Sequence, residues 1–470
     1  MHTIKNLIFL LTPHERKRAL VLLIMILIMA LLDMIGVASI LPFIAVLTNP
    51  TLIETNLFLN SLYQALFIFG VETNQHFIFA LGILLFLLLV ISLSFKALTI
   101  YFQVKFIEMC EYNISKRLVE GYLNQPYSWF ITQHSADLGT KVLSEAGQIS
   151  GGGIKPLIEI IAKGAITLAL IVLLIFVDPK LTLIIGLMLS GSYLIIFYII
   201  RKQLSKIGKE RLKNNQLRYK IVSEAFGATK EVKVGSLEKI YTDLFTNSAK
   251  IFAQSNSFAQ VIAQLPRYFL ETIAFGGVLI LMLYMMSQSG SFNEALPIIS
   301  LYVFAGYRLM PALQQVYASF NNLIFNRPSI DSLTEDFKKL GEQKIFPNKE
   351  TLIFKNEISL SNIYYNYPST SRKALKDISL NIKAKTTVAI VGPTGSGKTT
   401  LVDIILGLLV SQKGNLKVDG EIIEEKNVRS WQSCIGYVPQ HIYLSDDTIA
   451  ANIAFGKKSN EINQLAVERA

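Results

Sequence analysis

Six long apolar stretches constrain the fold of this chain more than any other feature of its sequence. A helix needs about 20 apolar residues to cross a bilayer, and each stretch is close to or above that length. The stretches are Ala19–Leu47, Phe77–Phe102, Gly153–Val177, Leu181–Ile200, Tyr268–Met286 and Leu296–Tyr317. Only 17% of the residues are charged, whereas globular proteins average about 25%. The sequence therefore predicts an α-helical domain of six transmembrane helices over residues 1–325.

The basic residues between these stretches predict how the chain is oriented. Residues 48–76 and 287–295 contain no Lys or Arg, whereas residues 201–265 contain twelve. Cytoplasmic loops of membrane proteins carry an excess of basic residues. We therefore expect both termini and the long loops 103–152 and 201–265 in the cytoplasm. The net charge of +11 then reflects membrane orientation, and no nucleic-acid partner is expected.

The segments between the membrane stretches carry further structure. Both long loops lack a Pro/Gly-rich break where they leave the membrane, so we expect the membrane helices to continue well beyond the bilayer. Residues 53–69 are too polar to cross it, and they are expected to form an amphipathic helix at the outer surface. Residues 326–356 are crowded with charges, which indicates a linker between domains.

The pattern after residue 356 is that of a soluble α/β domain. An apolar helix is expected over residues 398–409. Strands are expected over residues 358–365, 378–382, 387–391, 415–418 and 435–438. The predicted fold class is thus a six-helix membrane domain followed by an α/β P-loop domain over residues 357–470.

One motif in this second domain predicts a phosphate site. It matches G-x-x-x-x-G-K-[ST] and reads Gly392-Pro393-Thr394-Gly395-Ser396-Gly397-Lys398-Thr399. The glycines let backbone N–H groups approach phosphate oxygens, and the helix N-terminus adds partial positive charge. In such loops the Lys contacts the β and γ phosphates and the Thr hydroxyl binds Mg²⁺. We therefore expect ATP and Mg²⁺ as cofactors.

The residues around this loop resemble the nucleotide-binding domain of ABC transporters. The resemblance rests on residues 362–368, residues 375–380, the loop itself and Ile435-Gly436-Tyr437-Val438-Pro439-Gln440. It implies that Tyr367 stacks on adenine, that Thr400 joins the nucleotide site and that Gln440 binds Mg²⁺ beside Thr399. The family usually has Gly where this chain has Lys385, so we expect a different turn there.

The same resemblance implies motifs that these 470 residues do not contain. An ABC domain continues with a signature motif, a Walker B strand ending in a catalytic Glu, and a switch His. No such sequences follow Gln440. We therefore expect an incomplete domain, with the catalytic residues beyond Ala470, that binds nucleotide without hydrolysing it by itself.

The order of the two domains resembles that of ABC exporters. Bacterial flippases of lipid-linked oligosaccharides are similar over residues 265–271, 307–311 and 435–444. The resemblance implies an ATP-driven lipid translocase in the bacterial inner membrane, working as a homodimer or a heterodimer. It also implies coupling helices near residues 126–138 and 227–239, where the membrane domain meets the ATPase.

Three basic residues are candidate contacts for the substrate, a lipid headgroup carrying phosphate. Arg308 lies deep in the sixth stretch, while Lys96 and Arg267 lie nearer the cytoplasmic end. A charge inside the membrane is costly unless it faces a cavity or a partner. For Arg308 the structural alternative is a buried pair with Asp33. Other functions that remain open are a multidrug or peptide exporter, for which Arg308 would not matter, and a membrane-anchored nucleotide binder that transports nothing.

Overall fold

The computed structural model describes residues 2–67, 71, 73–177, 179–289, 292–341, 352–368, 373–440 and 442–470. It divides into two compact units. The first comprises residues 1–125 and 133–343, and the second comprises residues 126–132 and 344–470. Much of the expected linker 326–356 belongs to a helix of the first unit, and residues 342–351 lie outside the described part.

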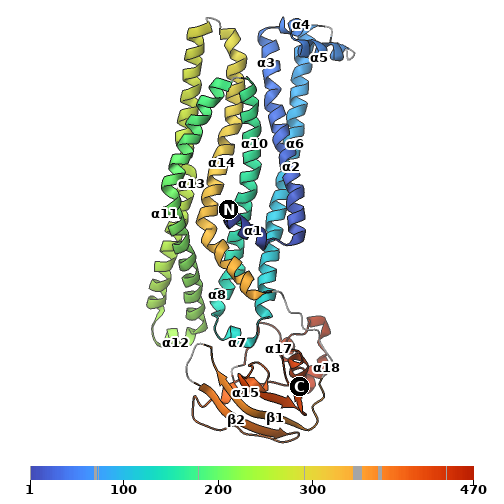
Figure 1. Ribbon diagram of the computed structural model, residues 1–470, viewed down its shortest axis with the longest axis vertical. Coiled ribbons are helices and arrows are strands. Elements are labelled where there is room, and N and C mark those ends of the chain that lie inside the picture. The colour runs from blue at the N-terminus through green and yellow to red at the C-terminus, as the bar shows by residue number, and fades with distance from the viewer. Residues whose placement is uncertain are drawn as a thin grey trace. The chain divides into compact units, whose positions relative to one another are not determined.

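The first unit is a bundle of long helices (Figure 1). Its N-terminal part and first crossing consist of α1 (His2–Leu10), α2 (Pro13–Ala38), α3 (Ile40–Thr48), α4 (Leu52–Thr55) and α5 (Leu57–Phe67). Next come α6 (Asn74–Leu123), α8 (Ser135–Thr140), the π-helical η1 (Lys141–Glu145), α9 (Ala146–Ile149), the π-helical η2 (Ser150–Ile154) and α10 (Lys155–Val177). The remaining helices are α11 (Pro179–Gly227), α12 (Thr229–Val234), α13 (Glu238–Ser289) and α14 (Phe292–Leu340).

The expected continuation of the membrane helices is confirmed. α6, α11, α13 and α14 each run for 49 to 52 residues, far more than a bilayer crossing needs. Among the described residues, three helical stretches are long and apolar enough to cross a membrane: Pro13–Thr48, Asn74–Leu123 and Ser135–Val177. The other three expected spans fall in α11, α13 and α14, where many side chains lie outside the described part.

Local sequence signals explain where the first two long helices begin. Thr12 and Glu15 form a capping box, in which the Thr12 hydroxyl accepts from the Glu15 N–H and Glu15 accepts from the Thr12 N–H. Pro13 occupies the first helical turn, where a missing N–H costs nothing. Thr73 caps α6 by accepting from the His76 N–H.

Apolar side chains of the bundle point outward as well as inward. Phe79 and Phe86 of α6 and Leu168 and Phe176 of α10 are all exposed. Exposed apolar surface on this scale suits a lipid environment rather than water. At one end of the bundle, α3, α4, α5 and the start of α6 bury a cluster around Val46, Leu59 and Phe77. Residues 68–70 of the expected amphipathic helix lie outside the described part.

Small residues let the helices of the bundle approach closely. A Cβ on Gly208 of α11 would lie 2.1 Å from the Phe325 carbonyl oxygen of α14, and one on Gly152 of η2 would lie 2.2 Å from the Asn326 amide nitrogen. Neither distance is possible for a real side chain. Because the Phe325 carbonyl belongs to the backbone, Gly208 sets the spacing of α11 against α14, whereas the Asn326 side chain fills the space beside Gly152.

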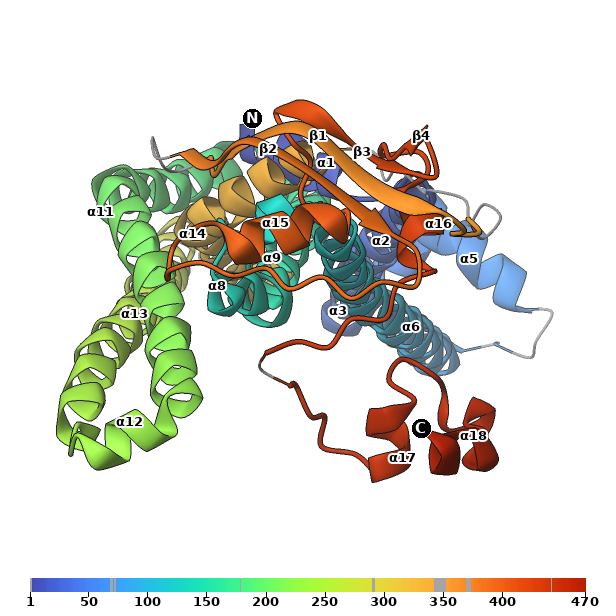
Figure 2. The ribbon, with the colours of Figure 1, turned by 90° about the horizontal axis from the view of Figure 1, so that it is seen from below.

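The second unit is built on a small antiparallel sheet with strand order β2-β1-β3-β4. Its elements are α7 (Tyr127–Phe130), β1 (Glu357–Asn366), β2 (Lys373–Lys383), α15 (Lys398–Ile405), β3 (Lys413–Val418), β4 (Glu421–Ile422), α16 (Val428–Gln432), α17 (Ile449–Ile453), the 3₁₀ turn η3 (Ser459–Glu461) and α18 (Gln464–Arg469). The strands lie side by side in Figure 2. Leu401 and Ile404 of α15 share a core with Leu360, Ile363 and Leu416 of the sheet.

Two expected strands are not strands in the structure. Residues 387–391 and 435–438 have no regular secondary structure, and Val391 and Val438 are 87% and 85% exposed. A strand exists through its ladder hydrogen bonds to a neighbour, and no described strand pairs with either segment. The expected helix 398–409 also ends early, because Gly407 with φ of 67° closes α15 in the left-handed conformation.

Candidate functional site

The phosphate loop connects residue 391 to the N-terminus of α15. Gly395 and Gly397 have φ of 78° and 92°, a conformation that favours glycine, and Gly397 caps α15. A Cβ on Gly397 would lie 2.6 Å from the Ala374 carbonyl oxygen of β2. Because only hydrogen fits at this position, the loop can lie close against β2. A glycine-rich loop that ends in a helix N-terminus is the kind of site at which proteins bind phosphate groups.

Lys398 is held over the loop by the loop itself. Its Nζ donates to the carbonyl oxygens of Gly392 and Pro393, at 2.8 Å and 2.9 Å. The neighbouring Thr399 is exposed, so its hydroxyl is open to a bound metal ion. The loop residues Pro393, Thr394 and Ser396 are exposed as well. The ammonium group thus lies at the loop where the sequence predicts that phosphate oxygens bind.

Tyr367 lies beside the start of α15. Its hydroxyl hydrogen-bonds the Thr400 hydroxyl at 2.9 Å, and its ring stacks edge-on against Tyr365 with centroids 5.2 Å apart. These two contacts bring the aromatic ring expected at the base next to the phosphate loop. Gln440 is exposed, and no hydrogen bond connects it to Thr399 within the described residues. Residue 441 lies outside the described part.

The second unit also contains two titrating groups near Tyr367. Asp403 is buried one turn after Thr400, and this burial raises the pKa of its carboxyl group. Burial also raises the pKa of the Tyr127 phenol in α7, with smaller contributions from Asp403, Tyr367 and Tyr437. Residues 126–132, which include α7, thus belong electrostatically and by packing to the same unit as the phosphate loop.

A group of charged residues lies inside the helix bundle, on four different helices. We call Asp33 of α2, Lys96 of α6, Glu159 and Lys163 of α10, and Arg308 of α14 the charge cluster. Arg308 donates from Nη1 to Asp33 Oδ1, and Lys96 Nζ lies 3.7 Å from Asp33 Oδ2. The Ser92 hydroxyl donates to Asp33 Oδ1 at 3.2 Å. The Asp33 carboxylate therefore forms ion pairs with two cations.

The second carboxylate of the charge cluster has neutral hydrogen-bond partners. Glu159 Oε2 accepts from Gln315 Nε2 at 2.7 Å and from Ser319 Oγ at 2.9 Å, both on α14. Lys163 interacts electrostatically with Lys96, Asp33 and Glu159. Three cations and two carboxylates thus meet within segments otherwise apolar enough for a membrane.

Comparison with family models and with known proteins identifies the fold. The model of the ABC transporter transmembrane region matches residues 38–309, more than half of the chain, and the ABC transporter model matches residues 375–469. The chain belongs to the ABC transporter family. The family implies that the second unit is an ATP-binding domain and that the helix bundle is a transmembrane domain.

Curated relatives extend this assignment. The chain is 26% identical to the ATP-dependent lipid A-core flippase of Wigglesworthia glossinidia brevipalpis over 354 residues, which is 74% of this chain and 59% of that protein. It is 26% identical to the protein of that name from Ralstonia nicotianae, over 76% of this chain and 60% of that protein. The chain thus spans about three fifths of the length of these relatives.

A solved structure shares the fold of this ABC transporter chain. The structure of a bacterial Atm1-family ABC exporter with ATP bound superposes with a TM-score of 0.69, over 97% of this chain and 76% of that chain. Sequence identity is 17%, so the likeness concerns the fold. Short helices occur within both regions where the sequence predicts coupling helices: α7 lies within residues 126–138 and α12 within residues 227–239.

Two of the three predicted substrate residues of the ABC transporter chain lie together. Lys96 and Arg308 share Asp33, and the pair between Arg308 and Asp33 is the structural alternative expected from the sequence. Arg267 lies apart. Its Nε donates to Glu271 one turn away at 2.6 Å, and within the described residues no contact joins it to Lys96 or Arg308.

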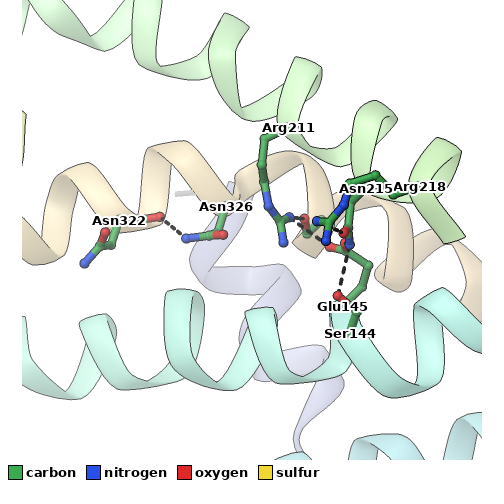
Figure 3. A network of polar contacts seen from close by, with 8 residues as sticks. Ser144, Glu145, Arg211, Asn215, Arg218, Asn322 and Asn326 are labelled. Atoms are coloured by element: carbon green, nitrogen blue, oxygen red, sulfur yellow. Dashed lines mark hydrogen bonds and ion pairs between the residues drawn. The ribbon is translucent and has the colours of Figure 1, made fainter. Parts of the chain in front are cut away.

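A further polar network was not predicted from the sequence. Figure 3 shows Arg211 and Asn215 of α11 pointing toward Glu145 of η1. Arg211 Nη1 donates to Glu145 Oε2 at 3.1 Å and to the Ser329 hydroxyl of α14 at 2.9 Å, while Asn215 donates to Glu145 Oε1 at 2.7 Å. The Glu145–Arg211 ion pair is almost completely buried. This network joins three helices outside the expected membrane spans.

Sequence reasoning also missed Lys163, Glu159 and Ser92. The sequence did contain a signal for Lys163 and Glu159, because both are charged residues within the apolar stretch Gly153–Val177. Ser92 gave no signal, since a serine in a membrane helix usually bonds its own backbone. Its role depends on the packing of α6 against α2, which a single sequence does not specify.

Proposed function

We propose that this chain is one subunit of an ATP-driven transporter that moves a phosphate-bearing lipid headgroup, such as that of a lipid-linked oligosaccharide, across a bacterial inner membrane. The observation that carries the proposal is the group of three cations within the charge cluster. Lys96, Lys163 and Arg308 lie on three packed membrane helices and supply a binding site for an anionic headgroup within a bilayer. The names of the flippase relatives support a lipid substrate.

The roles of the individual residues follow from their contacts. Arg308 gives only Nη1 to Asp33 among its described contacts, so its remaining N–H groups are available to phosphate oxygens. Its side chain is 20% exposed and that of Lys96 is 31% exposed, whereas that of Asp33 is 2% exposed. We propose Lys96 and Arg308 as headgroup contacts. Arg267 is proposed as a separate contact beside a hollow of about 120 Å³ lined by Met310, Pro311 and Gln314.

In the second unit, we propose that the phosphate loop holds ATP with Mg²⁺. Lys398 would exchange the carbonyl oxygens of Gly392 and Pro393 for phosphate oxygens, and Thr399 with Gln440 would hold the metal ion. Tyr367 would place its ring against the base. Bound Mg·ATP supplies the free energy of phosphate transfer. The chain's own residues bind and orient it.

The remaining proposals follow the family architecture. We propose a homodimer or a heterodimer with a related subunit, with both termini in the cytoplasm. The excess of Lys and Arg in residues 103–152 and 201–265 supports this orientation.

The first test concerns nucleotide. We expect the 470 residues by themselves to bind Mg·ATP without turning it over, because they contain no counterpart of the family's catalytic Glu or signature motif. Binding of a fluorescent ATP analogue and phosphate release are measured on the purified chain. Lys398→Ala is expected to abolish binding, and Lys338→Ala, a change at an exposed lysine of α14, to leave it intact. Lys398-dependent phosphate release at the rate of a complete family member would contradict the proposal.

The second test concerns substrate and uses the chain extended with the C-terminal part of a full-length relative. Loss of a charge-assisted hydrogen bond costs about 1.5–3 kcal/mol, so Arg308→Ala should weaken apparent affinity for an isoprenyl pyrophosphate lipid roughly 10- to 150-fold. Arg308→Lys should recover only part, because an ammonium lacks the two-point geometry of a guanidinium. Transport is measured in vesicles.

The matched control for Arg308 is Arg327→Ala. Arg327 lies on the same helix in an exposed pair with Asp331, so its loss should leave transport unchanged. Transport by the Arg308→Ala protein at the parent rate and affinity, with normal membrane insertion, would favour a multidrug or peptide exporter instead.

A further inference from the structure

Asp33 occupies an unusual position in the charge cluster. Its carboxylate is buried behind two cations that are themselves partly exposed. Both of its oxygens are engaged, Oδ1 by Arg308 and Ser92 and Oδ2 by Lys96. Any anion that binds Arg308 and Lys96 therefore meets groups that already have an anionic partner.

The energetics of the membrane interior explain why such a partner is present. A lone cation there costs several kcal/mol, and a pair of neighbouring cations also repel each other. Asp33 offsets both costs while the site is empty. The same charge lowers the attraction that an incoming phosphate experiences. A site without Asp33 would attract an anion more strongly and release it more slowly.

We propose that Asp33 is a resident counter-ion that competes with the anionic headgroup for Arg308 and Lys96, and thereby sets how tightly the headgroup is held. This inference rests on the proposed function, whose site it deepens. Ser92 helps Arg308 to change its partner from Asp33 to a phosphate, because the Ser92 hydroxyl still donates to Asp33 after Arg308 has left. Competition of this kind keeps affinity low enough for release on the far side of the membrane.

Glu159 provides the contrast within the same cluster. It is an intramembrane carboxylate of equal charge, but its hydrogen bonds within the described residues come from the neutral Gln315 and Ser319. Among the described residues, no ion pair joins Glu159 to Arg308 or Lys96. Neutralising Glu159 changes the net charge of the cluster as much as neutralising Asp33 does. It leaves Arg308 and Lys96 paired with Asp33, however.

The experiment measures anion binding to the full 470-residue chain in phosphatidylcholine nanodiscs. All variants carry Lys398→Ala, so that the phosphate loop does not bind the probes. The probes are a short isoprenyl pyrophosphate and inorganic pyrophosphate. We expect Asp33→Asn to tighten binding of both probes at least 10-fold, and Glu159→Gln to change it less than 3-fold. In Asp33→Asn/Lys96→Gln the lost anion is balanced by a lost cation, and affinity should return to within about 3-fold of the parent.

The outcomes separate this inference from the proposed function. If Asp33→Asn binds inorganic pyrophosphate more tightly but no variant binds the lipid, the lipid substrate is wrong and the counter-ion role stands. Equal effects of Asp33→Asn and Glu159→Gln would overturn the counter-ion role, as would unchanged or weaker binding in a well-inserted Asp33→Asn protein. Asp33→Ser provides a second neutral variant. If neither neutral variant inserts, Asp33 is a structural residue and the inference falls.

Discussion

At Lys385 the chain departs from the glycine that its family usually has, and the expected change of turn does not occur. Lys385 has φ of 59°, the left-handed conformation that glycine adopts without strain. The backbone therefore forms a left-handed turn here, although the Cβ of a lysine makes this conformation strained. The preceding residue explains why the turn is fixed, since the Ala384 N–H donates to the Asn356 carbonyl at 2.6 Å. Lys385 thus adopts the positive φ for which glycine is usually required.

Asp419 fastens the start of β1 to the turn after β3. Its carboxylate accepts from the backbone N–H groups of Glu357, Asn356 and Lys355, at 2.8, 2.7 and 2.6 Å. These hydrogen bonds, led by that from Glu357, lower the pKa of the Asp419 carboxyl group. The folded state thus favours the ionised form of Asp419.

The lowered pKa of Asp419 makes the stability of the second unit depend on pH. The stabilisation by Asp419 should be complete above the unfolded value of about 3.9 and should be lost as pH falls through the lower folded value. Asp419→Asn keeps the size of the side chain and tolerates its φ of 50° but removes the charge. Its midpoint of thermal unfolding should lie below that of the parent at pH 7, with the gap closing toward pH 3. Asp377→Asn, at another positive-φ aspartate, is the control. A gap that stays constant with pH would show that the charge of Asp419 is irrelevant.

At the scale of elements, the contact between α11 and α14 depends on a missing side chain. Gly208 lies against the Phe325 carbonyl oxygen, beside a small apolar cluster of Leu204, Ala259 and Phe325. Backbone atoms cannot move aside as a flexible side chain can. A methyl group at this position must therefore separate the two helices.

We predict that Gly208→Ala destabilises the bundle by about 1–3 kcal/mol, the usual cost of overpacking. Gly164→Ala in α10 is the matched control, because no described atom lies within 4 Å of the Cβ it would add. Thermal unfolding in detergent, followed by loss of monodisperse protein, compares the two. If Gly208→Ala unfolds at the parent temperature while its helices remain in contact by crosslinking, the close approach does not control stability.

The elements differ in how well the sequence predicts them, for physical reasons. Long apolar periodic helices such as α6 and α14 follow from local composition, so their existence was predictable. The π-helical segments η1 and η2 were not, because they depend on how Glu145 and Gly152 pack against neighbouring helices. The runs 387–391 and 435–438 have the composition of strands, but pairing with another strand decides whether they form one.

The candidate sites show the same division. The phosphate loop was predictable residue by residue, since its chemistry lies in one continuous motif. For the charge cluster, the depth of Arg308 identified it as a candidate and Asp33 as a possible partner. That Lys96 shares this partner, and that Lys163 lies in range, depends on the relative rotation of α2, α6 and α10, which local sequence does not encode.

For the whole molecule, the buried network around Arg211 indicates how the bundle is held together outside the expected membrane spans. Breaking one partner of such a pair usually costs about 3–5 kcal/mol, because the other charge is left buried alone. Exposed pairs such as Lys220–Glu224 on the same helix contribute little by comparison. The contacts of Arg211 with Glu145 and Ser329 therefore hold η1, α11 and α14 together.

The orientation of the whole molecule can be tested by labelling cysteines in intact cells. Cys110 is buried and Cys434 is exposed, so the parent carries Cys434→Ser. We expect Thr55→Cys to react with a membrane-impermeant maleimide from outside, and Asn247→Cys to react only after the cells are opened. Both positions are exposed, whereas the neighbouring Ser248 is too buried to serve. Labelling of Asn247→Cys in intact cells would reverse the proposed orientation.

The length of α6 gives the molecule a mechanical property. Its 50 residues contain no proline and form an unbroken rod about 75 Å long. Phe77 and Leu81 anchor one end among α3, α4 and α5. At the other end, Gly121 approaches Leu340 closely and Tyr122 donates to Asp336 of α14 at 2.9 Å. A rod of this length that pivots about its middle by ~10° swings each end through about 6–7 Å. α6 can thus act as a lever, turning a slight tilt at one end into a displacement as wide as a phosphate group at the other.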